Sequence, residues 1–533
     1  MLAAALIALA WLPADYGAAG VFHFAESFAT ARLWAEAAGL AALALALAAE
    51  RATPERGTDG RRRLARAGQL ALTALCAAIH PIMALPVVGA GLALAAWRDW
   101  RWLALPAAAG AALIGAGLAG APMAARLFQS LDPAWRAVTA ERTPVVFPTL
   151  WPATSWAWIV CQLTTLALAA RALEGPSRRL VIAAAGLGIA GLAVSLAWPN
   201  LLVVQLQPWR TLWLTAVMAT GALPIVGWAL WRQGGAGRAA LAALTLAWVL
   251  RDSAAATAGC SLLALALSAW PGDRPFLRPV WIGALGIAAG VGAAVAALRL
   301  GAGLAVFGPI TSTPAAALAN AWRTGLQVPL GLAAALTLAI AGTRLSGRWM
   351  RAAGAAAAGL LAVLAVLLWD ARAPFVRAAE DGRARLQLPA AASGAGVYWH
   401  DGFGAEWLIT RRPDWWGRWQ GAGMVFDRVQ ALEWERRRRL AAAAGLAPAV
   451  YRPSEGWPAP LTAVAARALC QAPGGPDVLI APAQLVGDAA LTGLATHWRA
   501  PTPELTPSAD RRRLVAVADY AVISCAAVRV ARR

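Results

Sequence analysis

The first residues able to do chemistry are two acids, Asp15 and Glu26, in a polar segment that precedes the apolar run 33–49. A carboxylate here can take a proton from a hydroxyl group or hold a divalent cation. The alternative is an ordinary solvated acid, or for Glu26 an ion pair with Arg32, since neither acid has a diagnostic partner spacing. We predict Glu26 and Asp15 as candidate catalytic residues. No cofactor is evident, although a divalent metal is compatible with these carboxylates.

A second candidate is the string WPNLLVVQLQPWRTLWL, residues 198–214, in which polar side chains interrupt an apolar approach to a helix. Arginine binds phosphate through two parallel donors, and glutamine can hydrogen-bond sugar hydroxyls or phosphate oxygens. Tryptophan can stack on a sugar face or a polyprenyl chain. We predict Gln205, Gln207, Trp209 and Arg210 as substrate-binding residues. The alternative is an aromatic belt with an arginine reaching the lipid headgroups.

Two further polar sites interrupt apolar segments. His80-Pro81 separates two apolar half-helices, where proline sets a turn and the imidazole meets the membrane interface. Arg251-Asp252 separates another such pair, and its alternative is a self-satisfied ion pair. For His80 the alternative is a structural hydrogen-bonding role. We predict His80 and Arg251 as further substrate-binding residues, because polar groups in or beside lipid usually serve a site or a partner.

The elements that must position these residues are membrane helices. Hydrophobic residues make up 60% of the chain, charged residues only 14%, and the mean hydropathy is +0.57. A spanning helix needs roughly 20 apolar residues, fewer in a hairpin or a thinned membrane. We predict a polytopic α-helical membrane protein with about 11–13 membrane helices. The candidate segments are 1–12, 33–49, 68–79, 82–96, 103–121, 156–170, 180–197, 211–230, 239–250, 253–269, 279–298, 326–343 and 352–369.

Arginine placement predicts the orientation of these helices, because cytoplasmic loops collect positive charge. The two sets of loops alternate if 68–96 and 239–269 are each helical hairpins, which turn at His80-Pro81 and Arg251-Asp252. The alternative for 239–269 is one long kinked helix, which would reverse every later loop. The predicted inner loops are 50–67, 98–101, 171–179, 231–238, 274–278 and 344–351, and the predicted outer loops are 13–32, 126–155, 198–210 and 299–325.

The composition changes after Trp369, which predicts a membrane domain at 1–369 and a soluble C-terminal α/β domain at 370–533. Charges become frequent there and long apolar runs cease. With the hairpin topology this domain lies on the outer, periplasmic face. Its segments 396–400, 478–481 and 520–525 are typical of short buried strands, and 427–444 and 460–471 are typical of helices.

Two features of this C-terminal segment leave alternatives open. Cys470 and Cys525 both fall in it and can pair if it faces an oxidising compartment, but spacing alone does not show that they are close. The run Arg436–Arg439 is most simply a solvated helical face.

The net charge of +20 does not indicate nucleic acid as a partner. The arginines stand in short groups between apolar segments, where loop charge sets membrane orientation. We therefore expect membrane lipids as partners and no nucleic acid. The sequence also contains no phosphate-binding P-loop motif and no HExxH motif.

The strings YWHDG, TRRPDWW, QGAGMVFDR, HPIMALP and QLQPWRTLWL, with the overall layout, resemble the GT-C superfamily of integral membrane glycosyltransferases, in an uncharacterised bacterial branch. The resemblance implies a multi-pass protein of the bacterial inner (cytoplasmic) membrane. It implies transfer of a sugar from a polyprenyl-phosphate-linked donor to an acceptor at the outer face, with an acid of the first outer loop as base or metal ligand. Asp15 and Glu26 occupy that loop. This chain departs from the family in its short first helix and in having single acids where a paired motif is common.

Two other functions remain open. A polymerase or ligase of cell-surface polysaccharide shares the lipid-linked donor and many helices, but typically carries paired arginines in a large outer loop. A transporter or flippase of a lipid-linked sugar should show internal repeats and charges near the middle of the membrane. The sequence identifies neither the sugar, nor the acceptor, nor the oligomeric state.

Overall fold

A computed structural model describes most of the chain and is predominantly helical, with one small sheet in the C-terminal region. Among the described residues, six helices are long and apolar enough to cross a membrane. The prediction of a helical membrane protein is confirmed at this level. The described residues are 2–12, 15–18, 22–23, 30–51, 59–271, 276–307, 327–341, 348–349, 352, 355–356, 359, 363, 374–388, 394, 396–400, 406–417, 420–421, 423–447, 460–507 and 514–531.

The chain divides into two compact units, each of which has its own core. Unit 1 holds nearly all of the apolar helices, and unit 2 holds Ala371–Arg533 together with the segments Leu131–Pro144 and Ala305–Ala317. The helices of unit 1 are α1 (Leu2–Trp11), α2 (Ala31–Arg51), α3 (Asp59–Ile79), α4 (Pro81–Ala96), η1 (Trp100–Leu103), α5 (Ala104–Leu118), η2 (Ala124–Phe128), η4 (Pro148–Leu150), α7 (Ala153–Ala172), α8 (Gly175–Ala197), α9 (Leu201–Leu206), η5 (Pro208–Thr211), α10 (Leu212–Arg232), α11 (Gly235–Val249), α12 (Ala254–Ser268), α13 (Arg278–Phe307) and α15 (Gln327–Ala341).

Both predicted helical hairpins are present. The chain leaves α3, passes through His80 in an extended conformation (φ −154°, ψ 96°) and enters α4 at Pro81. Proline suits the first position of a helix, because its missing N–H has no intrahelical partner there. The second hairpin pairs α11 with α12 across a turn at Leu250–Ser253, and the Ser253 side chain caps α12. This excludes the single kinked helix for that segment.

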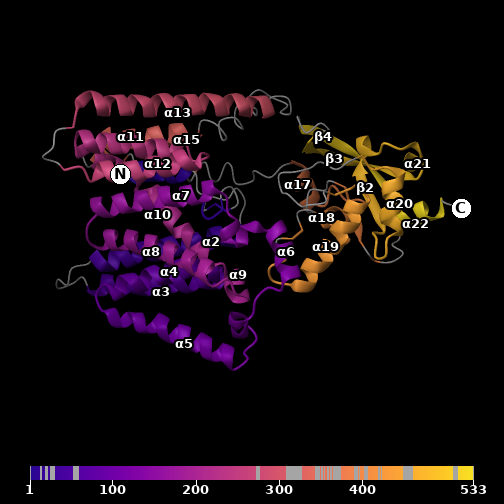
Figure 1. The fold of residues 1–533 in the computed structure, drawn as a ribbon, viewed down its shortest axis with the longest axis horizontal. Coiled ribbons are helices and arrows are strands. Elements are labelled where there is room, and N and C mark those ends of the chain that lie inside the picture. The colour runs from indigo at the N-terminus through magenta and orange to yellow at the C-terminus, as the bar shows by residue number, and fades with distance from the viewer. Residues whose placement is uncertain are drawn as a thin grey trace. The chain divides into compact units, whose positions relative to one another are not determined.

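The helices around α10 form the centre of unit 1 and the helices α5 and α13 form its two edges (Figure 1). Leu212, Trp213 and Leu214 at the start of α10 are completely buried. By contrast, the only buried residue of α5 is Gly117. Nearly all side chains of α5 are thus exposed, and exposed apolar side chains are unfavourable in water. We therefore expect lipid to cover these edges.

Unit 2 contains a four-stranded mixed sheet with the order β1-β2-β4-β3, in which β1 and β2 are parallel and the other pairs are antiparallel. The predicted strand segments 396–400, 478–481 and 520–525 overlap β1, β2 and the end of β4, respectively. The sequence did not indicate β3, whose alternation is interrupted by prolines and by a bulge between Arg499 and Glu504. The elements are α6 (Pro133–Arg142), α17 (Pro374–Glu380), β1 (Val397–Trp399), α18 (Glu406–Thr410), α19 (Arg428–Ala443), α20 (Ala463–Gln471), β2 (Val478–Pro482), η8 (Ala483–Leu485), α21 (Ala489–Thr492), β3 (Ala495–Pro507), β4 (Leu514–Ser524) and α22 (Cys525–Val530), and η3 (Pro144–Val146) follows α6.

A disulfide joins Cys470 at the end of α20 to Cys525 at the start of α22. The Cα atoms lie 5.1 Å apart, and both residues are completely buried. The pairing that the sequence left open is therefore made. It ties the helix before β2 to the helix after β4, which lie at the same end of the antiparallel β2–β4 pair, where Val478 is opposite Ser524.

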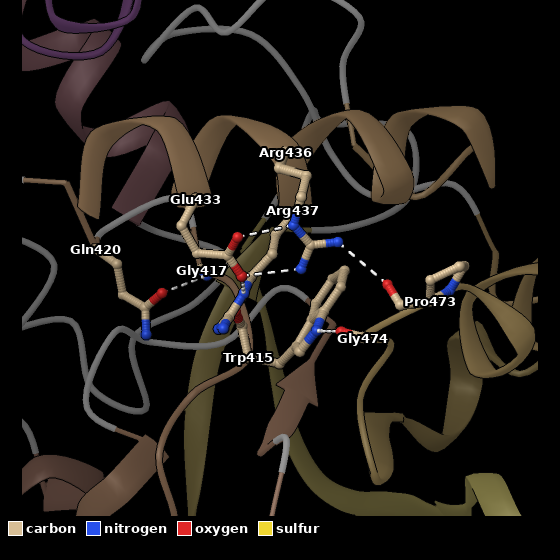
Figure 2. Close-up of polar contacts among 8 residues, drawn as sticks. All are labelled: Trp415, Gly417, Gln420, Glu433, Arg436, Arg437, Pro473 and Gly474. Atoms are coloured by element: carbon tan, nitrogen blue, oxygen red, sulfur yellow. Dashed lines mark hydrogen bonds and ion pairs between the residues drawn. The ribbon is translucent and has the colours of Figure 1, made fainter. Parts of the chain in front are cut away.

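Helix α19 connects the parts of unit 2 through its arginines (Figure 2). Arg437 donates to the carbonyl of Trp415 (2.6 Å) and Arg436 to the carbonyl of Pro473 (3.1 Å), and Glu433 accepts from both arginines. Arg438 is buried and pairs with Glu435, which is also buried. The prediction of a solvated face at 436–439 holds for Arg436 and Arg439, whose side chains are exposed, but it is wrong for Arg438, which is buried against Glu435.

Helix α6 belongs to unit 2 although it lies far upstream of the rest of that unit in the chain. The Trp135 indole donates to the carbonyl of Met424 (2.8 Å), and Arg428 pairs with Asp132 (2.6 Å). Because Trp135 is buried, its N–H needs this acceptor, and the contact fixes α6 beside the start of α19.

Candidate functional site

The first loop folds into a small hairpin that holds one of the two predicted acids. Asp15 and His23 face each other in an antiparallel bridge, and the Tyr16 N–H donates to the carbonyl of Phe22 (3.0 Å). Between them Gly17 has a left-handed backbone (φ 72°), which glycine adopts without steric cost. The carbonyl of Asp15 accepts from Trp158 (3.1 Å) and from Gln162 of α7 (3.0 Å), so the loop is fixed to the helix bundle.

A chain of alternating charges runs from this hairpin to three helices. Asp15 Oδ1 lies 2.5 Å from His23 Nδ1, and Asp15 Oδ2 accepts from Arg251 (3.2 Å). Arg251 lies 3.9 Å from Asp252, whose carboxylate pairs with Arg299 of α13. The Arg251-Asp252 pair is therefore not self-contained, because each member has a closer partner elsewhere. The Asp15 carboxylate is almost fully buried, with the His23 imidazole at one oxygen and the Arg251 guanidinium at the other.

The other face of the same hairpin carries two rings, because successive side chains of an extended strand point in opposite directions. The Tyr16 and Phe22 rings stack with centroids 5.9 Å apart. Two guanidinium groups lie against the Phe22 ring, Arg210 at 4.5 Å and Arg32 at 5.0 Å from its centroid. An aromatic face attracts cations, so Phe22 holds two like charges close together that would otherwise repel.

The short helix η5 brings Arg210 to this position. Gln207 has a left-handed backbone (φ 51°), which ends α9 and turns the chain into η5. The Arg210 side chain then donates back to Gln207 Oε1 (2.8 Å). Close packing on α8 requires a glycine, since a Cβ at Gly191 would lie 2.3 Å from the carbonyl oxygen of Pro208. The Ser195 hydroxyl accepts from the Trp209 N–H at the same contact (3.1 Å).

His80 and Glu36 belong to the same electrostatic neighbourhood. The charges of Arg210 and Arg32 both act on the His80 imidazole, and Glu36, Arg210 and Arg32 all act on the Tyr16 phenol. Burial raises the pKa of Tyr16, Glu36 raises it further, and the two arginines lower it. Glu36 is itself buried one helical turn after Arg32. Two arginines, an imidazole and a phenol thus lie within electrostatic reach of one another beside the buried Glu36 carboxylate, and the guanidinium groups are the members of this group that can bind an anion.

The remaining predicted residues fall in different places. Glu26 lies outside the described residues, so its prediction stays open. Gln205 accepts from Arg126 of η2 (2.7 Å), away from the Gln207–Arg210 contact. Trp209 is completely buried between Phe22 (5.5 Å between ring centroids) and Trp151 (5.1 Å), where it packs the hairpin onto the bundle. Within the described ranges no three metal-ligating side chains come together.

Sequence reasoning did not single out three residues of this site: His23, Phe22 and Arg32. The sequence signal that could have identified Phe22 and His23 is the string Val-Phe-His-Phe at residues 21–24. It lies between the two predicted acids, Asp15 and Glu26. What the sequence could not supply was the bridge that pairs Asp15 with His23, because such pairing depends on the turn between them.

The tail string that the sequence singled out forms the interior of unit 2. Tyr398, Trp415, Trp416 and Trp434 pack ring against ring, with centroids 5.7–6.3 Å apart, and all four are buried. The Tyr398 hydroxyl meets the His400 imidazole (3.2 Å) and donates to the carbonyl of Leu446. These rings therefore belong to the core of unit 2.

Searches against protein-family models, against curated proteins and against solved structures find no match to this chain.

Proposed function

We propose that this chain is a membrane glycosyltransferase that moves a sugar from a polyprenyl-phosphate-linked donor to an acceptor at the outer face of a bacterial cytoplasmic membrane. The observation that carries the proposal is the pair of guanidinium groups, Arg32 and Arg210, held against Phe22 beside the Asp15–His23 hairpin.

The charges at this place suit a phosphate. Arg210 is oriented by Gln207, and His80 adds a group that can donate a hydrogen bond. A lipid-linked donor keeps its chain among apolar helices and its phosphate at their ends, so its phosphate needs cations that the protein presents there. Charge-assisted hydrogen bonds of this kind contribute roughly 1.5–3 kcal/mol each.

Two features of unit 2 support placing it on the outer side. A disulfide persists in oxidising compartments, and Cys470–Cys525 is one. Helix α6 packs within unit 2, although both of its ends in the chain lead to helices of unit 1. Because α6 belongs to the 126–155 loop, which the arginine pattern predicts as an outer loop, its membership in unit 2 supports our proposal of an outer location for unit 2.

A transfer assay with matched arginine variants tests the proposal. Purified protein in liposomes would be given a polyprenyl phosphate carrying a radiolabelled sugar and an extract of cell-envelope acceptors. Arg210→Gln and Arg32→Gln should each raise the donor KM by about 10- to 100-fold, the factor that one lost charge-assisted hydrogen bond implies. Arg238→Gln is the control, because Arg238 also lies against aromatic rings, Trp231 (4.8 Å) and Trp281 (4.6 Å), but in a predicted inner loop.

Transfer that is unchanged in both Arg210→Gln and Arg32→Gln would overturn the assignment of the anion site. A donor that crosses the bilayer with its sugar–phosphate bond intact would instead identify a transporter. A product in which a preassembled glycan is joined to a second glycan would identify the polymerase or ligase alternative.

A further inference from the structure

We propose that Arg126, oriented by Gln205, binds the phosphate headgroup of an anionic phospholipid at the lipid-facing edge of unit 1. This inference goes beyond the proposed function and does not depend on sugar transfer. It gives Gln205, which the sequence predicted as a substrate-binding residue, a role toward a different ligand.

The short helix η2, which carries Arg126, folds back onto the end of α5. A Cβ at Gly117 would lie 2.8 Å from the carbonyl oxygen of Ala124 and 2.8 Å from Phe128 Cε2, so only glycine permits this contact. Ala124 and Leu127 are buried, whereas Met123 and Phe128 are 61% and 52% exposed. The helix therefore has one side against protein and one side on the surface that we expect lipid to cover.

A buried glutamine orients Arg126. Its Nη1 donates to Gln205 Oε1 (2.7 Å), and Gln205 is only 5% exposed. The N–H of Leu201 donates to the carbonyl of Gln129 (2.7 Å), which holds α9 against the chain after η2. Among the described residues the Arg126 side chain makes no other hydrogen bond or ion pair. The guanidinium is thus held at Nη1 and presents its Nε–Nη2 edge, whose two parallel donors match a phosphate.

The surrounding chain supplies no negative charge to this arginine. Arg126 is the only charged residue in 102–131, and 180–209, which includes α9, contains none. Arg251 and Arg299 of the same unit differ, because each pairs with a carboxylate. A cation beside lipid is costly without an anion. The phosphodiester of a phospholipid is an anion that the membrane interface itself provides.

The residues around Arg126 favour a lipid over a free phosphate ion. Met123 and Phe128 flank it in the chain, and Leu206, which follows Gln205, is 36% exposed. These apolar side chains can contact acyl chains while the guanidinium holds the headgroup. An ammonium group on the lipid would find no carboxylate in either uncharged segment, so an anionic headgroup fits better than a zwitterionic one.

This lipid site is separate from the anion site at Arg210. Gln205 and Gln207 stand two positions apart but hold different arginines, Arg126 and Arg210. The left-handed backbone of Gln207 (φ 51°) ends α9 between the two contacts. A phospholipid at Arg126 therefore does not occupy the groups assigned to the donor.

Titration of the full-length protein in a maltoside detergent, which contains no phosphate, tests the proposal. The thermal unfolding midpoint would be recorded with phosphatidylglycerol, with diacylglycerol of the same acyl chains, and with inorganic phosphate. We expect phosphatidylglycerol to raise the midpoint, because a ligand that binds only the folded state stabilises it. Diacylglycerol lacks the phosphate and inorganic phosphate lacks the chains, so neither should reproduce the effect at the same concentration.

Two variants localise the effect. Arg126→Gln should weaken the apparent affinity for phosphatidylglycerol by about 10- to 100-fold, the factor implied by one lost charge-assisted hydrogen bond. Gln205→Glu gives Arg126 a carboxylate partner, so the lipid effect should be lost while the midpoint without lipid stays near that of the wild type. Arg101→Gln is the matched control, since Arg101 precedes the same helix and its guanidinium has no acceptor among the described residues.

Each contrary result overturns the inference in a different way. An equal loss of affinity in Arg101→Gln and Arg126→Gln would show general attraction of anionic lipid. Equal stabilisation by diacylglycerol would show apolar coverage only, and equal stabilisation by inorganic phosphate would show a site for a free anion. An unaltered response of Gln205→Glu to phosphatidylglycerol would exclude the Arg126–Gln205 contact from lipid binding. Sugar transfer is not measured in this experiment, so the proposed function stands or falls separately.

Discussion

The substitution Gly17→Ala tests whether the first-loop hairpin builds the site. An added Cβ would lie 2.6 Å from Trp209 Cζ3 and 2.9 Å from Trp209 Cε3, well inside the 3.5–4.0 Å of an ordinary carbon–carbon contact. Trp209 cannot move aside, because it is completely buried between Phe22 and Trp151. The hairpin itself must therefore shift.

The size of the effect follows from two contributions. Holding alanine in a left-handed conformation costs about 1–2 kcal/mol. Overpacking against a fixed ring costs about 1–3 kcal/mol more. The sum, about 2–5 kcal/mol, would favour an open hairpin and weaken donor binding by roughly 30-fold or more. The matched control is Gly120→Ala, since Gly120 also has a positive φ (81°) but no atom within 4 Å of an added Cβ.

Donor affinity and the thermal unfolding midpoint of both variants would be measured in lipid nanodiscs. We expect Gly17→Ala to lose affinity and to unfold at a lower temperature than Gly120→Ala, which carries only the backbone strain. Equal unfolding midpoints and unchanged donor affinity in the two variants would refute the claim that the hairpin is packed on Trp209 and forms the anion site.

Three further predictions concern unit 2. Replacing Cys470 and Cys525 by serine opens a cross-link of sequence separation 55, which should cost about 4 kcal/mol on a chain-entropy basis and appear as faster proteolysis of unit 2; proteolysis at the wild-type rate would contradict it. Trp135→Phe leaves the Met424 carbonyl without its buried donor and should destabilise unit 2 by about 1–3 kcal/mol, measured by urea-dependent proteolysis with the exposed Trp407→Phe as control. Hydrogen bonds from Arg436, and then from Arg437, lower the pKa of Glu433 to about 2, so the contribution of this contact is complete above the unfolded value near 4.5 and is lost as pH falls toward 2. Proteolysis over that pH range should show a smaller acid effect in Glu433→Gln, and an identical acid effect would count against the contact.

The predictable part of the fold is the part that depends on local pattern. Apolar length predicted the membrane helices, and proline after His80 predicted the first hairpin turn. In unit 2, short apolar runs between turn residues predicted β1, β2 and the last five residues of β4. Strand β3 was missed because prolines and the bulge at Arg499–Glu504 break the alternation that a strand normally shows.

The candidate site was predictable only in its components. Asp15, His80, Arg210 and Arg251 were identified by residue type, but their grouping depends on pairing across long sequence separations. Asp15 meets Arg251 across 236 positions, a contact that no local pattern encodes. His23 was not predicted as a site residue because its contact with the Asp15 carboxylate depends on the antiparallel bridge, which the sequence does not reveal. The membership of α6 in unit 2 likewise follows from tertiary contacts, those of Trp135 with Met424 and of Asp132 with Arg428.

The central claim is that Arg32 and Arg210 recognise the phosphate of a lipid carrier. The most direct measurement compares binding of a polyprenyl phosphate and of the corresponding polyprenol, which has the same chain without the phosphate, to the wild type and to an Arg32→Gln/Arg210→Gln double variant. We predict that the wild type prefers the phosphate by at least about tenfold and that the double variant binds the two lipids equally. An undiminished preference for the phosphate in the double variant would contradict the account.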